Sequence, residues 1–176
     1  EQAKVHLYFK VGKHIRDWQT WQIASNDQGE NWSKPSLLVD DGSHSRGPVR
    51  NKPIILSNGD WLAPSSVEPS GDAWQVFCDR STDQGKTWQA TQLLTFSDQI
   101  DPKQRGAIQP TLWESEPGHV HMLTRSTCGW VLRSDSTDFG KTWCPLYPTS
   151  IANNNSGIDL AKFLVPDLPR ATCPGL

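Results

Sequence analysis

One eight-residue pattern occurs three times in the 176-residue chain at an almost constant interval. The pattern is S-x-D-x-G-x-x-W, and its copies span residues 25–32, 81–88 and 136–143. Its serines stand at positions 25, 81 and 136, so successive copies are 56 and 55 residues apart. Four fixed residues repeated three times at so regular an interval indicate a repeat architecture, in which each interval forms one supersecondary unit.

The chemistry of the repeated unit is that of a turn. Its Asp can accept hydrogen bonds from backbone N–H groups just ahead of it, and its Gly can take the positive φ of a tight turn. Ser adds a second local hydrogen bond, and Trp covers the turn with a large apolar face. Strand-like runs flank each copy, so each copy is predicted to cap a β-hairpin. This structural role is favoured over catalysis because it explains every position: Ser25, Asp27, Gly29, Trp32, Ser81, Asp83, Gly85, Trp88, Ser136, Asp138, Gly140 and Trp143.

The segments between the copies continue the repeat. Residues 53–64 and 110–123 each contain a short apolar strand, a turn with Gly and a second strand. An interval of about 55 residues therefore holds four strands, which is one blade of a β-propeller. The chain is predicted to be all-β and to form one partial propeller domain. Its blades are expected at about 1–40, 47–97 and 106–150, with the start of a further blade at 154–165 and a divergent, Pro-interrupted tail at 166–176.

Composition narrows the class of protein. The formal net charge is −2, and the chain has 13 Gly, 13 Pro and nine Trp. This charge argues against a nucleic-acid partner, which normally requires a basic surface. No apolar run approaches the roughly 20 residues of a membrane span, so none is predicted. Residues Glu1 to Lys4 are polar and do not form an intact signal peptide, although a signal peptide that has been cleaved off is compatible with this sequence. A secreted or extracellular location is favoured.

The three copies resemble the Asp-box (BNR) repeats of sialidases, also called neuraminidases. Three linking segments resemble the same group of sialidase-like exoglycosidases: residues 47–53, 109–112 and 154–159. The resemblance covers about residues 5 to 163 and implies a six-bladed propeller whose innermost strands open toward a central funnel. It further implies an exo-glycosidase, of exo-α-sialidase type if active, that acts on terminal, acidic sugars of glycans. No cofactor is expected.

The resemblance places candidate substrate-binding residues where blades begin. Sialidases carry an arginine just before such a strand, which grips the substrate carboxylate through a bidentate pair. Arg50 fits this pattern loosely, two residues further from the Pro than is usual, and an ordinary salt bridge in a solvated turn explains it equally well. The residues expected to bind the sugar at these blade starts are Arg50, Asn51, Lys52, Gln109, Asn154 and Ser156.

Three further residues are candidates on or near the same rim. Arg125 sits among apolar strand residues, so it needs a negatively charged partner, either a bound anion or an acidic neighbour. Glu68 is a candidate base or arginine partner, and Asp159 is a candidate acid. Surface exposure competes with these roles for Arg125 and Glu68, and a turn or strand-start hydrogen bond is slightly favoured for Asp159.

The sequence contains no recognisable match to the nucleophile of the sialidase family. Sialidases use a Tyr–Glu pair, but this chain has only Tyr8 and Tyr147, and neither lies in a recognisable nucleophile context. No catalytic residue is therefore assigned. Two alternatives to an enzyme stay open: a lectin-like propeller that binds glycans without hydrolysing them, and an inactive fragment whose open blade edges pair with a second copy.

Cysteines and histidines give weaker signals. The four cysteines are Cys78, Cys128, Cys144 and Cys173, which allow three ways of forming two disulfides. A bridge between Cys78 and Cys128 would join neighbouring blades, but buried or free thiols are favoured. His119 and His121 lie on one face of a predicted strand, yet no third ligand is evident, so no metal site is predicted.

Overall fold

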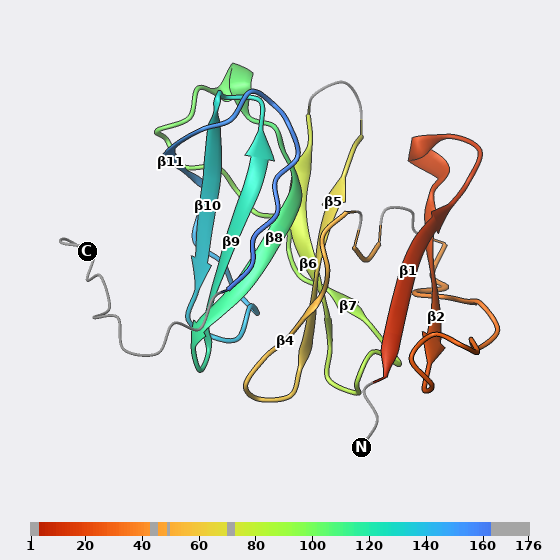
Figure 1. Ribbon diagram of the computed structural model, residues 1–176. Helices are drawn as coiled ribbons and strands as arrows, with labels where there is room; N and C mark the ends of the chain where they lie inside the picture. Colours follow the sequence, from red (N-terminus) through yellow and green to blue (C-terminus); the bar gives the residue numbers. More distant parts are fainter. Residues whose placement is uncertain (1–3, 43–45, 49, 70–72, 163–176) are drawn as a thin grey trace.

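A computed structural model of the chain describes residues 4–42, 46–48, 50–69 and 73–162, which form three antiparallel β-sheets (Figure 1). The first sheet contains β1 (Val5–Val11), β2 (Gln19–Ser25) and β3 (Ser36–Leu37). The second contains β4 (Ile54–Ile55), β5 (Trp61–Val67), β6 (Gln75–Ser81) and β7 (Gln89–Ala90). The third contains β8 (Ala107–Glu116), β9 (His119–Ser126), β10 (Trp130–Ser136) and β11 (Tyr147–Ala152). Two 3₁₀ turns, η1 (Ile15–Asp17) and η2 (Pro102–Gln104), lie between strands.

Each sheet is a simple meander. Neighbouring strands are consecutive in the chain and antiparallel, and the three sheets follow one another side by side in chain order (Figure 1). The ladder of β5 and β6 runs without a shift from the pair Trp61–Ser81 to the pair Val67–Gln75. The all-β prediction is confirmed, and each sheet has the up-and-down connectivity of a propeller blade. In the described part of the chain the first sheet has three strands, against the four expected for a blade.

The repeated S-x-D-x-G-x-x-W units form the predicted hairpin turns. In the second copy Ser81 Oγ accepts from Gly85 N at 2.8 Å, and Asp83 Oδ1 accepts from Thr87 N at 2.8 Å. The Thr87 hydroxyl donates to the other carboxylate oxygen at 2.6 Å. Both the glycine (φ 80°) and Gln84 before it (φ 62°) are left-handed. The polar side chains accept hydrogen bonds from backbone N–H groups that have no backbone partner in such a tight turn. The same arrangement recurs in all three copies.

The tryptophans of the repeat cover these turns to different extents. The indole Nε1 of Trp88 donates to Gly85 O at 3.2 Å, and that of Trp143 donates to Gly140 O at 3.1 Å. Trp88 is 6% exposed, whereas Trp32 in the first copy is 40% exposed. The apolar face of the residue therefore joins the core only where a neighbouring sheet covers it.

The main core lies between the second and third sheets. It contains side chains from both sheets, among them Leu62, Val76, Val120, Met122 and Leu132, each fully buried. Packing of two sheet faces in this way is what holds successive propeller blades together. Cys78 also lies in this core. Burial of these side chains supplies most of the driving force for association of the two sheets.

The first and second sheets are joined by a buried ion pair. The Asp79 carboxylate on β6 is completely buried and accepts from Arg46 Nε at 2.8 Å and Arg46 Nη2 at 2.6 Å. Gly47 N and Ser65 Oγ donate to its second oxygen at 2.6 and 3.1 Å. Each oxygen of the buried carboxylate thus accepts two hydrogen bonds, which is the condition under which a buried charge is tolerated. A small apolar cluster of Leu38, Ala63 and Trp88 packs nearby.

The described cysteines Cys78, Cys128 and Cys144 carry free thiols, so the structure does not form the bridge considered between the first two. Cys173 and the predicted tail at 166–176 lie outside the described residues. In the described part of the chain no helix is long and apolar enough to cross a membrane. The same residues contain no group of three or more His, Cys, Asp or Glu side chains placed to hold a metal ion.

Candidate functional site

Two predicted arginines converge at one end of the second and third sheets. Gln109, on β8, has φ 55°, a left-handed conformation that is uncommon outside glycine. Its Oε1 accepts from Arg125 Nη1 at 3.5 Å, and Arg125 Nε donates to Asn155 Oδ1 at 2.8 Å. Asn155 is also left-handed, with φ 63°. Side chains from β8, β9 and the segment after β11 therefore meet at one point.

Arg50 reaches the same point from the segment before β4. A Cβ added to Gly157 would lie 1.9 Å from Arg50 Nη1 and 3.1 Å from Gln109 Oε1. The guanidinium of Arg50 thus occupies the space that any other residue at position 157 would fill. Its charge is permanent, because an arginine does not lose its proton in a protein. We call Arg50, Gln109, Arg125, Asn155 and Gly157 the arginine cluster.

The guanidinium of Arg125 is held on a second side by an aromatic ring. Its Cζ lies 5.0 Å from the centroid of Trp74, which stands immediately before β6. A cation over an indole face is attracted by the ring quadrupole, and the contact keeps the planar guanidinium in one orientation. Asn155 and Trp74 thus fix Arg125 without neutralising it, because neither carries a charge.

Lys52 and Asp159 form an exposed pair beside the arginine cluster. Lys52 Nζ lies 3.3 Å from Asp159 Oδ2, and Thr111 Oγ1 donates to Asp159 Oδ1 at 3.1 Å. Desolvation raises the pKa of Asp159, but hydrogen bonds from Leu160 N, Thr111 and Lys52 outweigh it and hold this pKa below its usual value. Asp159 is therefore a carboxylate at neutral pH, and this state is poorly suited to the acid role considered for it.

The remaining blade-start residues differ in their surroundings. Asn51 is 4% exposed, and its amide nitrogen donates to the backbone carbonyls of Gln109 at 3.0 Å and Pro110 at 2.9 Å. Asn51 therefore connects the segment before the second sheet to β8. The amide hydrogens that would donate to a sugar are used in these two bonds. Asn154 and Ser156 are exposed, and the carbonyl of Ser156 accepts from Asn153 Nδ2 at 3.0 Å.

Glu68 lies near the junction of the first and second sheets. Burial lowers the pKa of Lys10 to about 8, and the negative charges of Asp79 and Glu68 partly oppose that shift. Lys10 Nζ donates to Arg46 O at 2.9 Å and to Thr20 Oγ1 at 2.5 Å. The negative charge of Glu68 therefore lies close enough to β1 to act on Lys10, and its role as a base or as an arginine partner stays a prediction.

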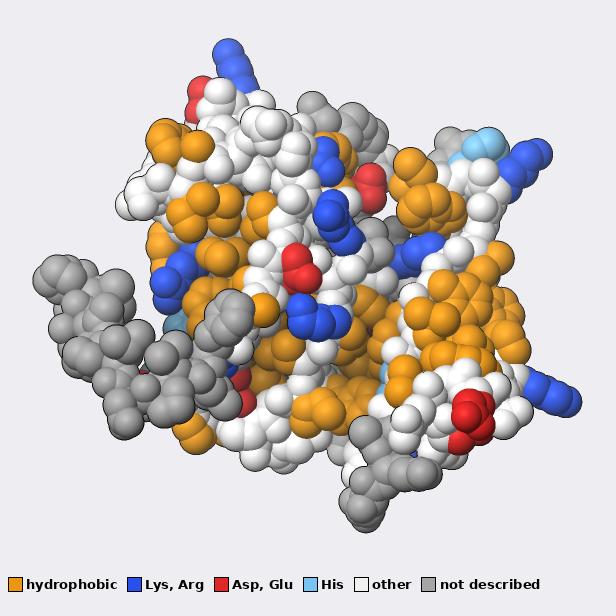
Figure 2. All heavy atoms as spheres, in the orientation of Figure 1, with side chains coloured by type: hydrophobic (Ala, Val, Ile, Leu, Met, Phe, Trp, Pro, Cys, Tyr) orange, Lys and Arg blue, Asp and Glu red, His pale blue; other side chains and the backbone are white. Residues whose placement is uncertain are grey.

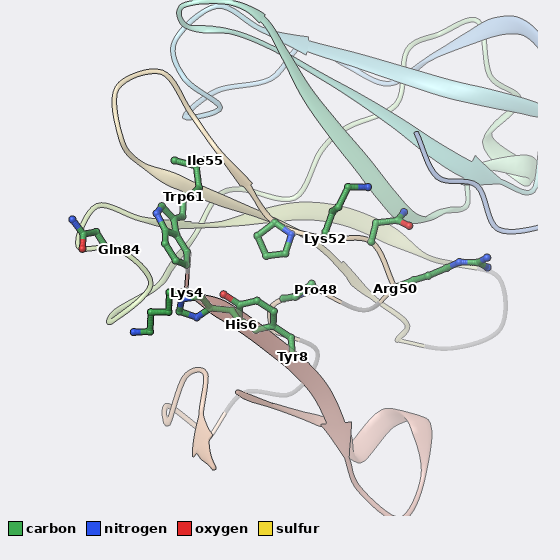
Figure 3. Close-up of a pocket in the computed structure, with 11 residues that line it drawn as sticks. Lys4, His6, Tyr8, Pro48, Arg50, Lys52, Ile55, Trp61 and Gln84 are labelled. Carbon is green, nitrogen blue, oxygen red and sulfur yellow. The ribbon is translucent and has the colours of Figure 1, made fainter. Parts of the chain in front are cut away.

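A groove of about 600 Å³ separates the first two sheets beside the arginine cluster (Figure 3). Tyr8 of β1 and Trp61 of β5 lie on opposite walls, while Arg50 points away from both (Figure 3). The Tyr8 hydroxyl is buried without a hydrogen-bond partner, and burial raises the pKa of Tyr8 to about 12. Of the described residues that line the groove none is acidic, and they are Lys4, His6, Tyr8, Pro48, Arg50, Asn51, Lys52, Pro53, Ile55, Trp61 and Gln84.

Basic side chains are prominent on the surface of the molecule. Figure 2 shows lysine and arginine side chains over the middle of the molecule, and hydrophobic side chains crowded over β1 and β2 at one side. Of the candidates taken from the sequence, Arg50, Gln109 and Arg125 come together, while the charge of Glu68 acts on Lys10 of β1. Asn155, Gly157 and Trp74 were missed, because their roles depend on contacts that a linear pattern does not display.

A family model described as a BNR repeat-like domain matches residues 1–165. The chain belongs to the BNR repeat-like domain family. This BNR repeat-like domain resembles a mutant of the NanB sialidase from Streptococcus pneumoniae with a TM-score of 0.63 and 19% identity, over 81% of this chain and 21% of that chain. It also resembles a protein of unknown function from Dyadobacter fermentans with a TM-score of 0.62 and 16% identity, over 83% of this chain and 42% of that one.

An intramolecular trans-sialidase from Ruminococcus gnavus is similar as well, with a TM-score of 0.56 and 23% identity, over 76% of this chain and 27% of that chain. No curated protein sequence matches the chain. The BNR repeat-like domain thus spans between a fifth and a half of the solved structures it resembles. At these identities the similarity establishes the fold, and it confirms the predicted sialidase-type propeller as a partial set of blades.

Proposed function

We propose that the arginine cluster binds the carboxylate of a terminal acidic sugar, as the carboxylate-binding part of a sialidase-like exoglycosidase site. The observation that carries this proposal is the placement of both arginines around one point: Arg125 Nη1 donates to Gln109 Oε1, and Arg50 Nη1 and Gln109 Oε1 both lie against Gly157. Among the described residues no carboxylate contacts either guanidinium, and two such groups held close together favour binding of an anion. A planar carboxylate can accept two parallel hydrogen bonds from each guanidinium.

The surroundings of the cluster suit a sugar acid better than a simple anion. The side chain of Gln109 and the exposed side chains of Asn154 and Ser156 offer both donors and acceptors for hydroxyl groups. Among the solved relatives, a Trypanosoma rangeli sialidase is in complex with sialic acid, and the Ruminococcus gnavus enzyme is in complex with oseltamivir carboxylate. Both of those ligands are carboxylates, which supports the same ligand chemistry here.

Binding without turnover is the second candidate, and the two tyrosines favour it. The Tyr147 hydroxyl donates to Asp135 Oδ2 at 2.5 Å, and that of Tyr8 is buried between the first two sheets. Burial and the Asp135 carboxylate together raise the pKa of Tyr147. Neither hydroxyl is therefore prepared to act as a nucleophile near the arginine cluster.

Ligand-observed NMR with N-acetylneuraminic acid tests the binding step. The methyl ester of the same sugar, which lacks the negative charge, is the matched ligand. We expect binding of the free acid to fall at least about tenfold in Arg50→Ala and in Arg125→Ala, since a charge-assisted hydrogen bond contributes about 1.5–3 kcal/mol. Lys141→Ala, which removes an exposed positive charge from the third Asp-box turn, should bind as the unaltered chain does.

Release of sialic acid from a sialylated glycan separates the two candidates. Release that disappears in Arg50→Ala would favour the exoglycosidase. Binding without release would favour the lectin-like alternative. Equal binding of the acid and its methyl ester, or unchanged binding in both arginine variants, would contradict the proposed site.

A further inference from the structure

A second group of reactive side chains lies on the third sheet, outside the arginine cluster. Ser115 Oγ is 2.7 Å from His121 Nε2, and His121 Nδ1 is hydrogen-bonded to Asp135 Oδ1. The three residues come from β8, β9 and β10, which are adjacent strands (Figure 1). A hydroxyl, an imidazole and a carboxylate joined in this order have the geometry by which nucleophilic triads are recognised.

The strand register explains why these residues meet. Trp113 of β8 and Asp135 of β10 are the direct partners of His121 on either side of β9. Ser115 lies two residues after Trp113, so it projects from the same face of the sheet. The ladder between β8 and β9 shifts between Glu114 and Glu116, which marks a bulge at Ser115. Bulges re-aim a side chain locally, and this one leaves the exposed Ser115 hydroxyl against the imidazole.

Hydrogen bonds fix the charge of Asp135. Burial raises its pKa, but bonds from His121, from Tyr147 at 2.5 Å and from Arg133 Nε at 2.9 Å outweigh burial and hold this pKa well below its usual range. A charged carboxylate at Nδ1 favours the tautomer that carries its proton there. Arg133 Nη2 is 3.1 Å from the same nitrogen, but it also pairs with Asp135 at 2.8 Å. With the Arg133 N–H and the Nδ1 proton both directed to the Asp135 carboxylate, Nε2 is the nitrogen that accepts the proton of Ser115.

An apolar groove begins beside the imidazole. The ring of Trp113 lies 4.7 Å from that of His121, measured between centroids. Trp113 also lines a groove of about 280 Å³ together with Leu123, Leu160, Ala161 and Lys162. Lys162 Nζ donates to the carbonyl of Glu114 at 2.8 Å, which places an ammonium next to the peptide of Ser115. A positive charge at that position can stabilise an oxyanion.

We propose that Ser115 and His121 form an acyl-transfer site for carboxylic esters with a small apolar acyl group, with Asp135 as the positioning residue. Ser115 Oγ attacks the ester carbonyl carbon and its proton passes to His121 Nε2. The bond to the alcohol oxygen then breaks, and the imidazolium returns the proton to the leaving alcohol. Water attacks the acyl-Ser115 in the same way, so that the carboxylic acid leaves and Ser115 regains its proton. The sum is one ester and one water giving one acid and one alcohol.

Covalent labelling and ester hydrolysis test this proposal on the intact chain. A fluorophosphonate should add once, at Ser115, with loss of fluoride, and peptide mass spectrometry locates the adduct. The chain should release p-nitrophenol from p-nitrophenyl acetate, with kcat/KM lowered at least about 100-fold in Ser115→Ala and in His121→Gln. Ser150→Ala, an exposed serine of β11, is the matched control and should keep full activity and labelling.

Two further readouts separate a triad from a structural cluster. Asp135→Asn should lower kcat with little change in KM, because it disturbs the tautomer of His121 and not the groove. Circular dichroism and thermal unfolding verify that each variant is folded. Labelling that persists in Ser115→Ala, or no adduct on the folded chain, would overturn the proposal. Sugar-acid binding by the arginine cluster should be the same in Ser115→Ala, so the two proposals fail independently.

Discussion

At the scale of single residues, Gly157 makes room for a charge. Its hydrogen faces the guanidinium of Arg50, and a methyl group there would lie 2.6 Å from Arg50 Cζ. The end of an arginine side chain is flexible, so the clash would move the guanidinium and leave the backbone in place. A glycine is therefore needed at position 157 to leave space for the guanidinium of Arg50, and not to form a turn.

Gly157→Ala should consequently weaken sugar-acid binding about tenfold, the cost of one misplaced charge-assisted hydrogen bond. The free energy of unfolding should change by less than about 1 kcal/mol, because no backbone strain is introduced. Isothermal titration calorimetry and urea unfolding measure the two effects. The double variant with Arg50→Ala is the control, since Gly157→Ala should have no further effect once Arg50 is gone. A full second loss of affinity would contradict this coupling.

The Asp-box carboxylates also act at the residue scale, through pH. The side chain and backbone N–H of Thr87 and the hydroxyl of Ser81 lower the pKa of Asp83 from 3.8 to about 2. In the unfolded chain these bonds are absent, so the unfolded state binds a proton first as the pH falls. The stability that Asp83 contributes is thus fully present above about pH 4 and is lost as the pH falls through about 2.

We expect the urea midpoint of the chain to fall between pH 4 and pH 2, and to fall less steeply in Asp83→Asn. Asp98→Asn, which changes a fully exposed carboxylate, is the matched control and should follow the unaltered chain. The prediction is wrong if the urea midpoint of Asp83→Asn falls as steeply between pH 4 and pH 2 as that of the unaltered chain.

At the scale of elements, Asp79 connects the first two sheets. It lies on β6, and its partners Arg46 and Gly47 belong to the segment that leads from the first sheet to the second. The same arginine also pairs with Asp41 at 2.7 Å, an acid that is 44% exposed. One guanidinium thus makes a buried and an exposed ion pair, which allows the two environments to be compared directly.

Asp79→Ala should lower the free energy of unfolding by about 3–5 kcal/mol, because Arg46 would be left without its buried partner. Asp41→Ala should lower it by no more than about 1 kcal/mol, since solvent screens an exposed pair. Urea unfolding followed by tryptophan fluorescence measures both. Similar losses in the two variants would show that burial does not decide the strength of this contact.

At the scale of the whole molecule, the outer face of the first sheet is apolar. Alternate residues of β1 point to opposite faces, and His6 and Tyr8 line the groove toward the second sheet. Val5, Leu7 and Val11 are 39%, 47% and 48% exposed. Apolar sheet faces of this kind are normally covered, and the association with a second copy that the open blade edges suggested from the sequence stays a prediction.

Light scattering of the purified chain should then give a mass above the monomer mass of 19.7 kDa that decreases on dilution. Leu7→Lys should shift the mass toward the monomer, because it places a charge in the apolar face. Lys86→Glu, which alters a charge on the second Asp-box turn, should leave the mass unchanged. A monomer mass for the unaltered chain at every concentration would contradict self-association.

The sequence by itself determined the repeating unit of this protein. Ser81, Asp83, Gly85 and Trp88 act on one another within eight residues, so their turn follows from local chemistry and reveals the hairpins and the period of the blades. The arginine cluster was predicted in part, because Arg50 stands at a blade start, yet its contact with Gly157 spans more than a hundred residues.

Only the tertiary structure decided which side chains meet. Packing of the second and third sheets brings Arg50 and Gln109 against Gly157, while strand register and a bulge bring Ser115 to His121. Asp159 has the residue type of a catalytic acid, but hydrogen bonds from Leu160, Thr111 and Lys52, which only the fold brings together, lower its pKa. The physical reason is the distance along the chain between the residues that interact. A turn is determined by residues that are neighbours in sequence. A site is assembled when apolar sheet faces pack together, and the polar residues of the sequence do not show which of them this packing brings into contact.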